Sequence, residues 1–137
     1  MVKDHDGGLT MNRPRPSIDQ QITFFYTQNG PKTWTFYEQV MGLPLVLDQG
    51  GCRIYCVVGD AYVGFCERAG PRPTEGVLFT IVTDEVDEWA EHLKAHGVEF
   101  TQEPKHNSEY QIYHFFAKDP NGYLIEVQKF DDLKWNA

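Results

Sequence analysis

The alternation of hydrophobic and polar positions predicts the same order of elements in both halves of the chain. In the first half, apolar residues stand at every second position over 21–27, which is typical of a strand. Apolar residues then recur at helical spacing towards Met41. Three short runs rich in apolar residues follow, at 45–47, 51–58 and 62–67. The first half is therefore predicted to be a module of order strand, helix, strand, strand, strand, at about residues 20–68.

The second half repeats this order at about residues 76–130. An apolar strand is predicted at 77–82, and a helix capped by Asp84 follows it and ends at Gly97. Three further strands are predicted, one opening at Phe100, one at 110–117 and one at 123–129. Because repetition of one plan within a chain determines its fold, we expect an α+β protein. Its paired βαβββ modules should form one curved, mixed sheet of eight strands, with the helices outside and a cleft on the other face.

A chain of 137 residues is expected to form a single domain, here at 19–137. Residues 1–18 are polar and contain Gly7-Gly8 and Arg13-Pro-Arg-Pro, so they are predicted to be a flexible tail. They lack the apolar core of a secretion signal, and no apolar run of the chain is long enough to span a bilayer. The formal net charge of −8 also argues against nucleic acid or an anionic membrane as a partner.

The three cysteines, Cys52, Cys56 and Cys66, do not have the spacing of a zinc site. An odd number of thiols fits a reducing compartment, so the expected location is the cytoplasm. No neighbouring residue in the sequence would activate Cys56 or Cys66 as a nucleophile. Both are therefore predicted to be small buried residues.

Three segments of the chain carry a resemblance to a known superfamily. They are Phe36-Tyr-Glu-Gln-Val-Met-Gly-Leu-Pro-Leu45, His92-Leu-Lys-Ala-His-Gly-Val-Glu-Phe100 and Phe115-Phe-Ala-Lys-Asp-Pro-Asn-Gly-Tyr-Leu-Ile-Glu126. In their order and spacing the chain resembles the vicinal oxygen chelate superfamily, which includes glyoxalases, bleomycin-resistance proteins and extradiol dioxygenases. The resemblance covers about residues 20–130. It implies the paired-module fold, a small-molecule ligand and a homodimer, and it leaves open whether modules pair within one chain or between two.

Metal-dependent members of that superfamily take ligands from the head of each module's first strand and from the end of each module's last strand. Carried over, these four positions hold Gln21, Phe65, Val77 and Glu126. The oxygens of Gln21 and Glu126 suit a hard divalent ion, whereas Phe65 and Val77 cannot coordinate a metal. The resemblance thus implies an incomplete site that binds a divalent metal weakly or not at all, unless Glu67, on the same strand face as Phe65, completes it.

Other residues are candidates for ligand binding or proton transfer. His114 lies within a predicted strand, aligns roughly with Arg53 of the first half, and is the type of side chain that most readily carries protons near neutral pH. Glu126 and His114 are therefore the candidate catalytic pair. Aromatic side chains that face the cleft would give it an apolar lining. The candidate ligand-binding residues are Gln21, Phe25, Arg53, Tyr55, Phe65 and Phe79.

Three functions stay open at this point. The first is a glyoxalase-like lyase or isomerase, or a dioxygenase, that acts on a small carbonyl or vicinal-oxygen substrate through Gln21 and Glu126, with His114 or Glu67. The second is a metal-free binding protein of the bleomycin-resistance type, for which an acidic chain suits a cationic ligand. The third is a relative with a degenerate site. Because two ligand positions lack metal-binding side chains, the second and third are favoured over a standard glyoxalase.

Overall fold

The structure, a computed structural model, describes residues 14–135. Its first module contains β1 (Gln21–Thr27), α1 (Gly30–Thr35), the π-helical turn η1 (Phe36–Val40), β2 (Leu45–Asp48), β3 (Cys52–Val58) and β4 (Ala61–Glu67). Its second module contains β5 (Leu78–Val82), α2 (Val86–Ala95), β6 (Phe100–Asn107), β7 (Ile112–Lys118) and β8 (Leu124–Phe130). The order of elements is the predicted one in both modules. Of the predicted tail, residues 14–18 are exposed and form no helix or strand, and residues 1–13 lie outside the described part.

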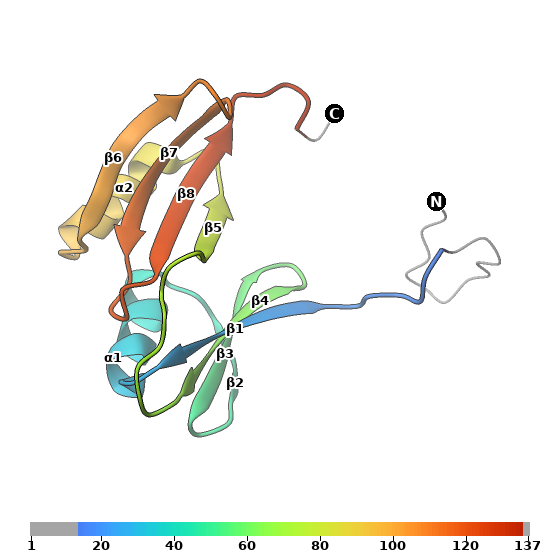
Figure 1. The fold of residues 1–137 in the computed structure, drawn as a ribbon, viewed down its shortest axis with the longest axis vertical. Helices are drawn as coiled ribbons and strands as arrows, with labels where there is room; N and C mark the ends of the chain where they lie inside the picture. Colours follow the sequence, from blue (N-terminus) through green and yellow to red (C-terminus); the bar gives the residue numbers. More distant parts are fainter. Residues whose placement is uncertain (1–13, 136–137) are drawn as a thin grey trace.

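The eight strands form two four-stranded sheets (Figure 1). The strand order is β1-β4-β3-β2 in the first sheet and β5-β8-β7-β6 in the second. In each sheet the module's first strand pairs in parallel with its last strand, and the other pairs are antiparallel. Over residues 14–135 no strand ladder joins the two sheets. The continuous eight-stranded sheet expected from the sequence is therefore replaced by two sheets of the same plan.

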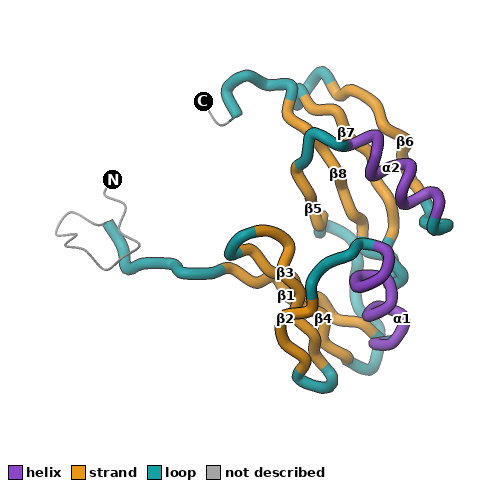
Figure 2. Tube along the Cα trace, turned by 180° about the vertical axis from the view of Figure 1, so that it is seen from behind, coloured by secondary structure: helices purple, strands orange, loops and turns teal. Residues whose placement is uncertain are grey.

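One face of each sheet is covered by the helix of its own module. Figure 1 shows α2 behind β6 and β7, and Figure 2, seen from behind, shows it in front of the sheet. The buried residues of α2 lie at helical spacing: Val86, Ala90 and Leu93. In the first module α1 contacts β4, and Phe36 and Tyr37 of the adjoining η1 are buried in the core. We call the covered side of each sheet its helix face and the other side its open face.

The first helix begins and ends where the local sequence predicts. The side chain of Asn29 accepts a hydrogen bond from the Lys32 amide at 3.1 Å, which is the usual cap of a helix N-terminus. Glu67, on the neighbouring strand β4, accepts a second bond from the Gly30 amide at 3.0 Å. After η1, Gly42 adopts a positive φ of 70°, a conformation that glycine takes without steric cost, and Pro44 prevents a further turn. The helical segment predicted towards Met41 is thus present, as α1 followed by η1.

Hydrogen bonds from the β7–β8 turn join the two modules. Asp119 accepts a bond from the hydroxyl of Tyr37 at 2.8 Å, and Tyr123 donates one to the backbone carbonyl of Tyr26 at 2.9 Å. Asn121 accepts from Thr27 at 2.7 Å and donates to Thr33 at 3.1 Å. These bonds tie the turn sequence Asp-Pro-Asn-Gly of the second module to residues of the first module of the same chain. The turn therefore positions the second module against the first.

Two strands differ from the sequence expectation by more than one residue at an end. β6 extends over eight residues rather than a short segment, and β7 begins at Ile112 rather than Tyr110. The reason is the turn before β7, where Gln111 has a φ of 53° and leaves the extended conformation.

Among the described residues, no helix combines the length and the apolar character that crossing a membrane requires.

Candidate functional site

The register of the strands decides which side chains reach the open face of each sheet. In a strand, successive side chains point to opposite faces. Phe25 and Phe65 are register partners and pack against Tyr37, with ring centroids of Tyr37 and Phe65 at 4.2 Å, so they lie on the helix face. Ile22 and Phe24 therefore lie on the open face of the first sheet, where 40% and 49% of their surfaces are exposed.

In the second sheet the same rule places two candidate residues, Glu126 and His114, on the open face. Ile125 and Val127 flank Glu126 and are completely buried in the core on the helix face. Phe115 follows His114 and is buried in that core as well. Glu126 and His114 thus point away from α2, towards the side of the sheet that no helix covers.

Glu126, His114 and Thr80 form one hydrogen-bonded group. Nδ1 of His114 lies 2.7 Å from Oε2 of Glu126, and the hydroxyl of Thr80, the register partner of Glu126 on β5, donates to Oε1 at 3.0 Å. His114 and Glu126 are only 5% and 7% exposed. A buried carboxylate is stable only when its oxygens accept hydrogen bonds, and here both do. In contrast, Nε2 of His114 is buried and has no hydrogen-bond partner among the described residues.

Apolar groups border the Glu126 side of this cluster on the same face. The ring of Phe116, the register partner of Glu126 on β7, meets the imidazole of His114 edge to face at 5.0 Å. Leu78 of β5 and its register partner Leu124 of β8 extend the apolar surface. The arrangement is thus an oriented imidazole beside a carboxylate in apolar surroundings, which can accept, hold or move a proton of a bound molecule.

Arg53 and Tyr55 lie on the helix face of the first sheet, in a hydrogen-bonded network of their own. Both donate to Oε2 of Glu38, at 2.7 and 2.8 Å, and Arg53 also lies 3.3 Å from Asp48. Burial and the bond to Glu38 raise the pKa of the Tyr55 hydroxyl. The guanidinium of Arg53 is 5.1 Å from the ring centre of Trp34. These contacts hold η1 against β3 and do not reach Glu126.

The expected aromatic lining divides between the core and a cavity between the modules. Phe25 stacks on Phe65 at 5.6 Å, and Phe65 and Tyr55 are almost completely buried in the core. Phe25, Phe79 and Gln21 border a cavity of about 650 Å³ between β1 and β5, and Thr80 borders it as well. Three of the candidate ligand-binding residues thus share a cavity with a member of the Glu126 cluster.

The candidate metal ligands do not come together. Gln21 and Glu67 lie at opposite ends of the ladder between β1 and β4, six residues apart, a separation of about 20 Å along a strand. Both follow the helix-face alternation of Phe25 and Phe65, whereas Glu126 lies on the open face of the other sheet. Glu67 accepts the hydrogen bond of the Gly30 amide, and the side chain of Gln21 donates to Thr23 at 2.6 Å.

The remaining ligand positions do not supply metal-binding groups. Phe65 is a core residue, and Val77 precedes β5 with 40% of its surface exposed. A shift by one residue along the strand does not supply ligands either. The neighbours of the ligand positions are Ile22, Gly64 and Leu78, and none of them has a ligating side chain. Among residues 14–135 no group of three or more histidine, cysteine, aspartate or glutamate side chains could hold a metal ion. The donor set therefore does not fit a catalytic divalent metal.

The cysteines depart from the sequence expectation. Cys52 and Cys66 face each other as register partners on β3 and β4 and form a disulfide. Cys66 is buried as predicted, but as half of this bridge rather than as a small apolar residue. Cys56 carries a free thiol and is only partly buried. The sequence contained no signal for the pairing, because it depends on the register of two strands.

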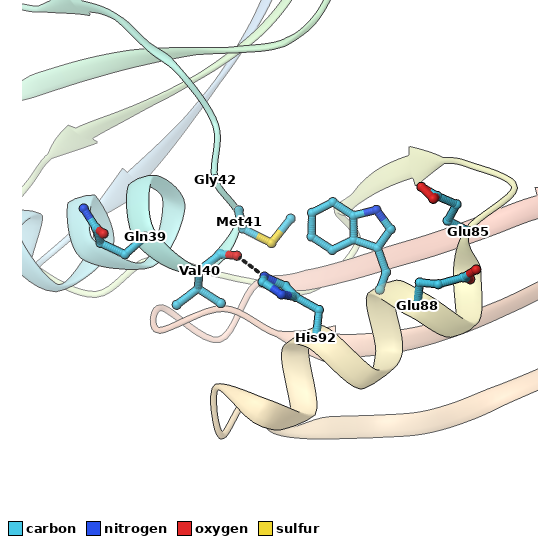
Figure 3. Close-up of a pocket in the computed structure, with 8 residues that line it drawn as sticks. Gln39, Val40, Met41, Gly42, Glu85, Glu88 and His92 are labelled. Atoms are coloured by element: carbon cyan, nitrogen blue, oxygen red, sulfur yellow. Dashed lines mark hydrogen bonds between the residues drawn. The ribbon is translucent and has the colours of Figure 1, made fainter.

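A second cavity, of about 380 Å³, opens between the ends of the two helical segments (Figure 3). Met41 lies on one side of it, and Glu88 and His92 of α2 lie on the other. Nε2 of His92 is 2.7 Å from the backbone carbonyl of Val40, which links α2 to η1 across the module junction. The cavity lies on the helix side of the sheets and is therefore separated from Glu126 by the second sheet.

Thr80 is the functional candidate that sequence reasoning missed. A threonine within an apolar strand carries no signal of its own, and only the parallel register of β5 and β8 brings it to Glu126. The one available signal was its place two residues after Leu78, on the same face of the predicted strand.

Comparisons with known proteins identify the fold. A model of the glyoxalase/bleomycin resistance protein/dioxygenase superfamily matches residues 20–127. A protein of that description from Nocardioides is 18% identical, with a TM-score of 0.71, over 88% of this chain and 87% of its own. A lactoylglutathione lyase from Agrobacterium tumefaciens is 24% identical, with a TM-score of 0.66, over 85% of this chain and 96% of its own. TioX from Micromonospora sp. ML1 is 15% identical, with a TM-score of 0.68, over 80% and 97%.

These similarities confirm the predicted fold class and the predicted superfamily resemblance. Because each identity is below 25%, the solved structures establish the fold of this chain and not its reaction. No curated protein gives a significant match to the sequence.

Proposed function

Because the chain belongs to the glyoxalase/bleomycin resistance protein/dioxygenase superfamily, we propose that it binds a small molecule at the open face of the second sheet, without the standard metal site. The observation that carries the proposal is the buried pair of His114 and Glu126, 2.7 Å apart, with Thr80 on the second carboxylate oxygen. Buried polar groups in apolar surroundings are typical of ligand sites in which a few polar atoms orient the bound molecule.

We further propose that the chain acts as a homodimer. The open faces carry exposed apolar side chains that a second copy would cover: Ile22, Phe24, Tyr26, Leu78 and Val82. Contiguous apolar surface of this kind favours association. A second copy would also close the open face around Glu126 and give the small molecule an enclosed site.

Elemental analysis of the purified protein beside Glu126→Ala tests the incomplete metal site. We expect far less than one divalent metal per chain in both proteins, because the oxygens of Gln21, Glu67 and Glu126 do not converge. Isomerisation of the methylglyoxal–glutathione adduct is expected to be absent. Stoichiometric metal in the wild type that is lost in Glu126→Ala would contradict the proposal.

A second candidate function is metal-independent proton transfer at a carbon next to a carbonyl. The free Nε2 of His114 favours it, because an imidazole oriented by a carboxylate is the common form of a general base. Exchange of the substrate's α-proton into deuterated water, measured by NMR with small carbonyl compounds, tests this function. Exchange that His114→Asn abolishes supports it, and equal rates with both proteins refute it.

We also propose that the chain works in the cytoplasm. In that compartment the disulfide that joins Cys52 and Cys66 in the structure would be held reduced. Alkylation of the three cysteines during cell lysis tests the location: three labelled thiols per chain support it, and labelling of Cys56 alone overturns it.

A further inference from the structure

The hydrogen bonds of Glu126 determine which nitrogen of His114 carries the proton. A carboxylate can only accept hydrogen bonds. Oε1 of Glu126 already accepts from the hydroxyl of Thr80 at 3.0 Å, and Oε2 lies 2.7 Å from Nδ1 of His114. Nδ1 must therefore be the donor. In a neutral imidazole with its proton on Nδ1, the other nitrogen, Nε2, has a free lone pair and acts as an acceptor.

No group among the described residues uses that lone pair. Nε2 is buried and has no partner among residues 14–135, although buried polar atoms are almost always hydrogen-bonded. On the open face His114 has Lys105 of β6 and Gln128 of β8 as its register partners. Lys105 is exposed and Gln128 is partly exposed, and no hydrogen bond joins either side chain to Nε2. Both side chains are long, so they can swing aside when a small molecule approaches the imidazole.

The surroundings favour a neutral hydrogen-bond donor over a cation. Each oxygen of Glu126 already accepts one hydrogen bond, from Thr80 and from His114, and the side chain is only 7% exposed, so a cationic group would have to be stripped of water to reach the carboxylate. Lys105 lies beside His114 on the same face and would repel one. The ring of Phe116 and the side chains of Leu78 and Leu124 offer apolar contact instead. An ammonium group would lose its hydration in these surroundings for a carboxylate that already accepts two hydrogen bonds.

We propose that the molecule bound at this site is an apolar compound with a hydroxyl group, such as a phenol or an enol, and that its hydroxyl donates a hydrogen bond to Nε2 of His114. This inference rests on the proposed function, because it names the ligand class of the same open-face site. It also accounts for Thr80, which keeps Glu126 in the orientation that directs the His114 proton to Nδ1.

Two fluorinated probes of nearly equal shape test the ligand class. 4-Fluorophenol and 4-fluorotoluene differ in one hydroxyl, and the toluene is the more hydrophobic, so non-specific binding would favour it. In ¹⁹F NMR titrations with the wild type we expect 4-fluorophenol to bind about tenfold more tightly, the effect of one hydrogen bond in a dry site. Tighter or equal binding of 4-fluorotoluene would overturn the inference while leaving the ligand site in place. Failure of both probes to bind would refute the site itself.

The variant Glu126→Gln tests the part played by the tautomer. The glutamine side chain offers a donor as well as an acceptor to Nδ1, so the proton of His114 is no longer held on Nδ1 and part of the protein carries it on Nε2, which then accepts no hydrogen bond. We expect the preference for 4-fluorophenol to fall below about threefold, since Nε2 is an acceptor in only part of the protein. Glu88→Gln makes the same change at an exposed position of α2, on the helix face of the sheet. It should leave the tenfold preference intact. Loss of preference in Glu88→Gln, or its retention in Glu126→Gln, would contradict the mechanism.

The tautomer has its own readout, which does not depend on any ligand. In ¹⁵N-labelled wild-type protein, the ¹⁵N chemical shift of His114 Nε2 should be that of an unprotonated nitrogen, and in Glu126→Gln it should move towards that of a protonated one. Circular dichroism spectra show whether both proteins are folded. A protonated Nε2 in the wild type would overturn the inference even if both probes bind.

Discussion

Asp119 accepts four hydrogen bonds at the junction between the two modules. Its carboxylate accepts from the Tyr37 hydroxyl at 2.8 Å and the Asn121 side chain at 3.2 Å, and from the amides of Asn121 and Tyr123 at 2.8 and 2.9 Å. Burial nevertheless outweighs these bonds and raises the pKa of Asp119 above its usual value of 3.8. Burial and the nearby carboxylate also raise the pKa of the Tyr37 hydroxyl, so this hydroxyl remains a donor.

The raised pKa of Asp119 predicts how the stability of the protein depends on pH. A carboxyl group with a raised pKa in the folded state stabilises the fold fully below pH 3.8, and this contribution is lost as the pH rises through the folded pKa. Asp119→Asn does not titrate. The difference in the free energy of unfolding, wild type minus Asp119→Asn, should therefore fall as the pH rises from 4 to 7, by about 1.4 kcal/mol for each unit of pKa shift.

Thermal unfolding of both proteins across this range measures the effect. Asp60→Asn, in the exposed turn between β3 and β4, is the control for the loss of one carboxylate. A difference between wild type and Asp119→Asn that stays constant or grows with pH would show that the hydrogen bonds of Asp119 outweigh its burial.

At the scale of elements, the start of α1 depends on a close approach between Gly30 and β4. A Cβ atom at Gly30 would lie 2.4 Å from Oε2 of Glu67 and 2.8 Å from the ring of Trp34. The carboxylate that caps the helix would have to move away and give up the Gly30 amide. Glu67, a metal candidate in the sequence, thus has a structural contact that accounts for its position.

Gly30→Ala is therefore expected to destabilise the protein by about 1–2 kcal/mol, the cost of one buried hydrogen bond together with local overpacking. Urea unfolding followed by circular dichroism measures the change. Gly51→Ala is the matched control, since its Cβ would meet only Oε1 of Glu67, at 3.9 Å. Equal losses in the two variants would mean that the Glu67 cap does not stabilise α1.

The elements themselves were predictable from the sequence, but the faces of the strands were not. In β1 both alternating sets contain apolar residues, Ile22 and Phe24 on one side and Phe25 on the other, so alternation alone does not identify the core side. The superfamily resemblance gave Gln21 and Phe65 as cleft positions, whereas the register places both on the helix face. In β8 the completely buried Ile125 and Val127 leave Glu126 only the open face, and the strong Asp-Pro-Asn-Gly turn fixes where that strand begins.

At the scale of the whole molecule, residues 14–135 cover each sheet on one face only. The open face of the first sheet carries Ile22, Phe24 and Tyr26 with 40%, 49% and 49% of their surfaces exposed. These three residues lie on one strand with period two, so their side chains form a continuous apolar stripe along β1. Exposed apolar stripes of this kind are uncommon on isolated chains, and the stripe is therefore where the proposed homodimer can be tested.

Phe24→Lys places a charge in the middle of this stripe, where a second copy would bury it without a partner. Because burying an unpaired charge costs several kcal/mol, the variant should be a monomer of 15.8 kDa at micromolar concentration, whereas the wild type should have twice that mass. Light scattering coupled to size exclusion measures both masses. Val58→Lys adds the same charge at the end of β3, where Val58 is 70% exposed and lies outside the stripe, and it should leave the dimer intact. A monomeric wild type, or a dimer that survives Phe24→Lys, would show that the open face of the first sheet is free in solution, and the site around Glu126 would then have to bind its ligand within one chain.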